Sequence, residues 1–134
     1  MPRRKREPVR IMNAVGSATD SSVINVEDYR HVVVVLSATL NSTLTFNFKG
    51  SVLDTADLTA ARTIVNLWDY VSAYDLEDPA TLIDGDTGVT LNNATVVANT
   101  HQYIINTDHL ALFAVETTAW TDGAITVWAV AVND

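Results

Sequence analysis

Hydrophobic and polar residues alternate with a period of two along much of the chain, and this pattern predicts β-strands. The clearest case is residues 44–49, which place Leu44, Phe46 and Phe48 on one side and polar side chains on the other. Successive side chains of a strand point to opposite faces. We therefore expect a strand with one buried face.

Other short β-rich runs are separated by turn residues. Residues 29–36 contain four consecutive valines, which favours a strand buried on both faces. Further strands are expected at residues 22–26, 63–74, 89–91, 95–98, 101–106, 110–116 and 124–132. A short helix over residues 54–62 is an alternative to irregular structure there, because alanine and leucine tolerate helix well.

The turns between these runs recur at the spacing that is typical of β-sandwiches. Asp122-Gly123 lies between two β-rich runs and predicts a hairpin, and Asn41-Ser42 is a second candidate. Residues 75–86 are acidic and rich in turn formers, so they are expected to form the main loop. About eight strands at this spacing, without helical periodicity, predict an all-β, antiparallel, jelly-roll-like β-sandwich.

Charge divides the chain into two parts. Residues 1–10 carry five basic side chains and one acidic side chain, whereas residues 11–134 carry three basic and fifteen acidic ones. The amino-terminal segment also has two prolines and no apolar periodicity, which indicates an extended tail. We therefore expect a basic arm at residues 1–20 and a sandwich domain at residues 21–134.

The basic arm is a candidate partner-binding segment, because exposed arginines pair readily with carboxylates. Its basic residues are Arg3, Arg4, Lys5, Arg6 and Arg10. Phosphate binding by the same residues is the alternative, but an acidic body would repel nucleic acid. An acidic protein surface is the expected partner.

Catalytic chemistry finds little support in the sequence. The chain has no cysteine, and it lacks the nucleophile-elbow, phosphate-loop and dinucleotide-binding motifs. No apolar run approaches the roughly 20 residues of a membrane-spanning helix, and the basic start lacks the apolar stretch of a secretory signal. We expect no enzyme activity, no cofactor, no export signal and no membrane partner.

Two groups of side chains remain as candidate binding residues. Trp68, Tyr70 and Tyr74 would share one side of the strand at residues 63–74, as part of a subunit interface or as a surface that stacks on sugars. Carboxylates near the main loop could gather around calcium without the EF-hand spacing, which the sequence does not match. They are Asp75, Glu77, Asp78, Asp84 and Asp86.

The carboxyl-terminal half resembles small virion proteins of tailed bacteriophages. The residues that carry the resemblance are Leu82–Val89, Tyr103–Ile105, Leu110–Val115 and Trp120–Val127, which read as an acidic turn, a tyrosine-containing strand, a leucine-rich strand and a final hairpin. This resemblance implies a capsid decoration, head-fibre or tail component, commonly trimeric. The compact basic arm departs from the pattern.

The sequence thus predicts a non-enzymatic structural protein of a virus particle, made in the host cytoplasm and incorporated into the virion. The favoured form is a phage capsid decoration protein that self-associates, as a homotrimer, and grips the major capsid protein or another virion protein through its arm. A carbohydrate- or receptor-binding module of a phage tail or fibre is the first alternative. A small jelly-roll coat protein with a genome-binding arm is the second.

Overall fold

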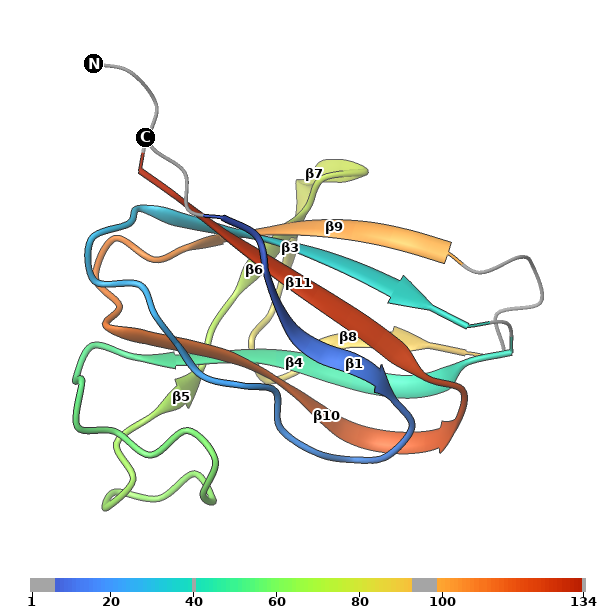
Figure 1. The fold of residues 1–134 in the computed structure, drawn as a ribbon, viewed down its shortest axis with the longest axis horizontal. Coiled ribbons are helices and arrows are strands. Elements are labelled where there is room, and N and C mark those ends of the chain that lie inside the picture. Colours follow the sequence, from blue (N-terminus) through green and yellow to red (C-terminus); the bar gives the residue numbers. More distant parts are fainter. Residues whose placement is uncertain (1–6, 40, 93–98, 134) are drawn as a thin grey trace.

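The computed structural model describes residues 7–39, 41–92 and 99–133, and these form a sandwich of two antiparallel β-sheets (Figure 1). The six-stranded sheet contains, in spatial order, β1 (Val9–Val15), β11 (Ile125–Val132), β3 (His31–Ala38), β9 (Asn99–Asn106), β6 (Ala73–Asp75) and β7 (Asp78–Ile83). The five-stranded sheet contains β2 (Ile24–Asn25), β10 (Leu112–Asp122), β4 (Thr43–Ser51) and β5 (Asp69–Tyr70), and β8 (Val89–Leu91) also pairs with β4.

The order of the strands is that of a jelly roll. Four strands of one sheet, β1-β11-β3-β9, face four of the other, β2-β10-β4-β5. The chain crosses from one sheet to the other between β3 and β4 and again between β10 and β11. The all-β sandwich expected from the sequence is therefore confirmed. The β6–β7 hairpin extends the six-stranded sheet beyond β9 and stands out from the body of the sandwich in Figure 1.

The core lies where the inward-facing rows of the two sheets meet. Phe46 and Phe48 of β4 are buried as the alternation predicted, and both rings contact Tyr103 of β9 at centroid distances of 5.7 and 5.5 Å. The Phe113 ring of β10 stacks on Phe48. Edge-to-face and offset ring pairs add to the free energy gained by removing these large apolar surfaces from water.

The sandwich begins earlier in the chain than the boundary at residue 21 that the sequence suggested. β1 lies within the predicted arm and pairs with β11, and its Ile11 and Met12 are 4% and 3% exposed. Register shifts between Arg10 and Met12 and between Met12 and Val15 interrupt the alternation, because each bulge moves side chains to the other face. This interruption hid the strand in the sequence pattern.

The segment from residue 52 to 86 also differs from the prediction. Residues 52–68 form an irregular loop without a helix, so the long strand expected at residues 63–74 is wrong. Only β5 and β6 form there, and they belong to different sheets. The predicted main loop at residues 75–86 contains strand β7. The strand expected at residues 95–98 lies outside the described residues.

Asp122-Gly123 forms the turn between β10 and β11, and Asn41-Ser42 lies in the turn between β3 and β4. Neither is the hairpin that the sequence predicted, because the two strands that each turn joins belong to different sheets and do not pair. Gly123 has a φ of 90°, in the region that glycine adopts without the steric cost that a Cβ brings. A Cβ built on Gly123 would also lie 2.6 Å from Ser42 Cα, in the neighbouring turn between β3 and β4. Glycine is required at this position for both reasons.

We expect Gly123→Ala to lower the free energy of unfolding by roughly 1–3 kcal/mol, because it combines backbone strain with a clash. Gly16→Ala is the matched control: Gly16 has no positive φ, and its added Cβ would lie 3.2 Å from one carbonyl oxygen. Urea denaturation of the two variants measures both effects. Equal stability of the two variants would contradict the turn assignment.

Candidate functional site

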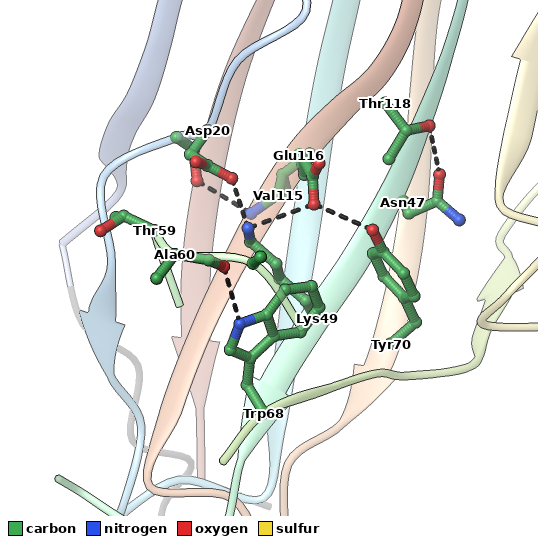
Figure 2. Close-up of polar contacts among 12 residues, drawn as sticks. Asp20, Asn47, Lys49, Thr59, Ala60, Trp68, Tyr70, Val115, Glu116 and Thr118 are labelled. Atoms are coloured by element: carbon green, nitrogen blue, oxygen red, sulfur yellow. Dashed lines mark hydrogen bonds and ion pairs between the residues drawn. The ribbon is translucent and has the colours of Figure 1, made fainter. Parts of the chain in front are cut away.

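A buried lysine organises the outer face of the five-stranded sheet. Lys49 of β4 has a side chain that is 1% exposed, and its ammonium pairs with Asp20 and, at 3.2 Å, with Oε1 of Glu116 (Figure 2). The same ammonium lies 4.5 Å from the centre of the Trp68 ring. Two carboxylates and an aromatic face thus replace the water that an exposed lysine would have.

These partners come from three separate parts of the chain. Glu116 is on β10, beside β4 in the sheet. Asp20 belongs to the connection between β1 and β2, and its backbone forms an isolated antiparallel β-bridge with that of Glu116. Trp68 ends the loop at residues 52–68. The cluster therefore ties the amino-terminal connection and this loop to the same sheet face.

The loop is held against the sheet by its own apolar and polar anchors. Leu58 and Trp68 are 1% and 7% exposed, and they pack with Ala114 of β10 in a small cluster separate from the main core. The Trp68 indole N–H donates to the carbonyl oxygen of Ala60 at 3.0 Å, and the Ser51 hydroxyl donates to that of Leu67 at 2.6 Å. The irregular backbone is thereby fixed without helix or strand.

Tyr70 of β5 completes the buried part of the cluster. Its hydroxyl donates a hydrogen bond to Oε1 of Glu116 at 3.0 Å, and its ring meets the Trp68 ring edge-on at 5.0 Å. Burial, together with this bond to a carboxylate, raises the pKa of Tyr70 to about 12. The phenol is thus held in its neutral, proton-donating form.

Arg62 lies at the outer rim of the cluster. Its guanidinium lies over the Tyr70 ring, 4.8 Å from the centroid, and bonds to Asp69 and Asp86, each at 2.8 Å. These three charged side chains are 44%, 75% and 71% exposed, so solvent screens their attraction. The rim links β5 to the turn before β8 but adds little to stability.

A recess of about 280 Å³ lies beside the lysine, lined by residues of the cluster and of the loop. The ionisable groups at its walls already have partners: Lys49 binds Asp20 and Glu116, Tyr70 binds Glu116, and Arg62 binds two aspartates outside the recess. The arrangement matches a satisfied polar network that fixes the loop on the sheet.

The three aromatic residues that the sequence placed on one stripe do not lie together. Trp68 and Tyr70 belong to the cluster on the five-stranded sheet, and the face of Trp68 is occupied by Lys49. Tyr74 lies on β6, in the other sheet, and is 44% exposed. The chain changes sheets between β5 and β6, so a shared aromatic face cannot form.

The acidic residues considered for calcium are engaged locally. Asp84 accepts the backbone N–H of Asp86, Asp75 accepts that of Glu77, and Asp78 accepts the Thr81 hydroxyl. Within the described part of the chain, no three histidine or carboxylate side chains gather as metal ligands would. Asp86 instead pairs with Arg62.

Of the predicted arm residues, Arg10 is on β1, with its guanidinium 5.6 Å from the centre of the Trp128 ring. Arg3, Arg4, Lys5 and Arg6 lie outside the described residues. The described residues contain no helix that is long and apolar enough to cross a membrane.

Lys49 is the residue that sequence reasoning missed. Strand alternation placed it with Thr45 and Asn47 on the solvent side of β4, which is the correct face. No local pattern shows that a loop beginning only a few residues later folds back over this face. Asp20 and Glu116 are 29 and 67 positions away from Lys49, too far for a spacing rule to connect them.

The fold recurs in solved structures. The SPBc2 prophage-derived protein YomS superposes with a TM-score of 0.68 at 16% identity, over 99% of this chain and 96% of that one. The PBSX exported protein XepA superposes with a TM-score of 0.66 at 13% identity, and this chain spans 39% of its length. No protein-family model matches the chain, and no curated protein matches its sequence. At these identities the likeness establishes a shared fold.

Replacing Lys49 by methionine should lower the free energy of unfolding by about 2–4 kcal/mol, since it leaves two partly buried carboxylates without their cation. Arg62→Met is the matched control, because it removes an ion pair of exposed groups and should cost less than about 1 kcal/mol. Chemical denaturation of both variants gives the comparison. Similar losses of unfolding free energy in the two variants would show that burial does not determine how much the ion pairs of Lys49 stabilise the fold.

Tyr70 should make stability depend on alkaline pH. Its pKa is raised in the folded state, so the unfolded chain loses the phenolic proton first, and stability should fall as pH rises from about 10 to about 12. Tyr70→Phe should remove this part of the slope and cost about 1 kcal/mol at neutral pH through the lost hydrogen bond. Unfolding curves from about pH 9 to about pH 12 for the two proteins test the difference, and parallel curves would refute it.

Proposed function

We propose that this protein is a non-enzymatic structural component of a bacteriophage particle that works by binding other proteins. The observation that carries the proposal is the jelly-roll sandwich, shared over almost its whole length with a prophage-derived protein. The candidate site adds support, because its charged groups stabilise the loop on the sheet and bond to one another.

Within the particle, we propose the role of a capsid decoration protein. Jelly rolls serve widely as capsid domains. The basic side chains before β1 would bind an acidic surface of the major capsid protein or of another virion protein through charge-assisted hydrogen bonds. Since β1 is built into the sheet, such a segment would be anchored directly to the rigid sandwich.

The alternative of a sugar-binding module loses its main support. A sugar stacks on an open aromatic face, but the Trp68 ring is 7% exposed and has the Lys49 ammonium over it. The alternative of a genome-binding coat protein depends on the basic segment alone, and the remainder of the chain is strongly acidic. Protein binding agrees better with both observations.

Purified particles from a host that carries the gene test the proposed setting. The chain should be found among their proteins by mass spectrometry, and electron microscopy of particles with and without it should show difference density on the head. Particles that lack the chain altogether would overturn the proposal, and density only on the tail would leave the structural role but reject decoration.

The basic segment should control attachment. Reversing Arg3, Arg4, Lys5 and Arg6 to glutamate should weaken binding to native particles at low salt, and wild-type binding should also weaken as salt rises, because the Debye length is about 8 Å at physiological ionic strength. Cosedimentation measures both effects. Attachment that neither salt nor charge reversal changes would contradict an electrostatic role.

Folding supplies the control for this experiment. Deleting residues 1–6 should leave the thermal unfolding midpoint nearly unchanged, because strand β1 begins at Val9. Deleting residues 1–12 should lower the midpoint, because it removes the buried Ile11 and Met12. A large loss of stability in the shorter deletion would make reduced attachment uninformative and show that the segment belongs to the fold.

A further inference from the structure

The outer face of the six-stranded sheet carries exposed and half-buried apolar side chains at its centre. In β3 and β11 the side chains alternate between the core and this outer face, which receives Val33, Val35, Trp128 and Val130 at its centre and the polar His31, Ser37 and Thr126 towards the strand ends. Trp128 is 39% exposed and the three valines are half-buried. This explains the run of four valines, which the sequence alone suggested to be buried on both faces.

The apolar side chains form a continuous band across the sheet. Strand register places Val130 opposite Val33, Val33 opposite Ile104, Ile104 opposite Tyr74, and Tyr74 opposite Leu82. Directly opposed residues in adjacent antiparallel strands point to the same face. The band therefore crosses five strands, and it becomes most exposed at Tyr74 and Leu82, at 44% and 56%.

The central strands of this face are also free of charge in a strongly charged protein. The three strands β3, β9 and β11 contain no Asp, Glu, Lys or Arg, whereas the whole chain carries 24 such residues and a net charge of −8. Interface cores are depleted of charged residues, and Trp, Tyr and Arg are the side chains that most often contribute binding energy there. Trp128, Tyr74 and Arg10 all lie on or beside the band.

We propose that this face binds the same face of a second copy of the chain, so that two sandwiches pack sheet against sheet in a two-fold dimer. At a spacing of about 4.8 Å and a rise of about 3.3 Å, six strands with eight residues in the longest present roughly 600 Å² per copy. This approaches the roughly 800 Å² per partner of a standard interface. Two highly acidic copies can meet here because the central strands β3, β9 and β11 carry no like charges to repel one another.

Charges at the two edges of the sheet define the direction of the two-fold axis. The β1 edge carries Arg10, whereas the β6–β7 hairpin at the opposite edge carries Asp75, Glu77 and Asp78. Strand register puts Val9, next to Arg10, in the same cross-strand row as Asp75 and Asp78, and this row shares the core-facing side of the sheet with Val34 and Tyr103. Glu77, in the turn between Asp75 and Asp78, has a side chain that is 81% exposed and is the acidic group placed to meet Arg10 of a second copy. A two-fold axis parallel to the strands keeps this row level and sets the basic edge of each copy against the acidic edge of the other.

Multi-angle light scattering over a range of concentrations tests the pairing with the full chain. We expect the wild type to approach the mass of two 14.6 kDa chains, and Val33→Lys or Trp128→Lys to weaken dimerisation at least tenfold. Ile64→Lys is the matched control: Ile64 is 92% exposed at the loop over the other sheet, and its replacement should leave the dimer intact. Thermal unfolding checks that each variant folds.

Three outcomes would overturn the proposed dimer. They are a monomer at every concentration, a mass of three chains, and dissociation by Ile64→Lys but by neither outer-face variant. Any of these would leave the proposed virion role standing, because that role is tested by the composition of particles.

A charge exchange tests the axis. Arg10→Glu and Glu77→Lys should each weaken the dimer, and the two changes in one chain should restore it, because the two positions lie at opposite edges of their own sheet and meet only between copies. Arg10→Glu combined with Asp54→Lys is the control that should give no rescue, since Asp54 lies in the loop of the other sheet. Absence of rescue in the first pair would reject this axis.

Discussion

The pairing of Lys49 with Asp20 and Glu116 is the interaction on which the arrangement of the irregular segments depends. A buried ammonium is costly unless anions satisfy it, and here the anions come from the β1–β2 connection and from β10. Because Trp68 covers the same ammonium, the loop at residues 52–68 must close over the sheet as well. One desolvated charge thus determines the position of two segments that lack regular secondary structure.

The consequence is a sandwich with two unlike outer faces. The loop at residues 52–68 packs on the five-stranded sheet, where Lys49 and Tyr70 both bond to Glu116. On the outer side of the six-stranded sheet, β3, β9 and β11 present a central group of valine, isoleucine and tryptophan side chains together with uncharged polar residues such as Ser37, Gln102 and Thr126.

Strand positions could be predicted from the sequence wherever a single period of two was maintained. β3, β4, β9 and β11 follow the expected runs closely, because each has an inward row of large apolar residues. β1 was missed because its bulges place Ile11 and Met12, two successive residues, in the core. The site was missed because its parts are far apart in the sequence, and only the folded sheet brings them together.

The run of four valines in β3 is not fully explained by the packing of one chain. Four valines in a row predicted burial on both faces, yet in the folded monomer Val33 and Val35 remain half-buried. A strand of an antiparallel sheet that faces water usually alternates apolar and polar residues, and β4 does so even where its outer face is covered. The departure of β3 and β11 from this rule is not required by the core, since Val32, Val34 and Leu36 already fill it. The proposed pairing of two copies would account for it, because burial against another sheet is the environment in which such strands are ordinarily found.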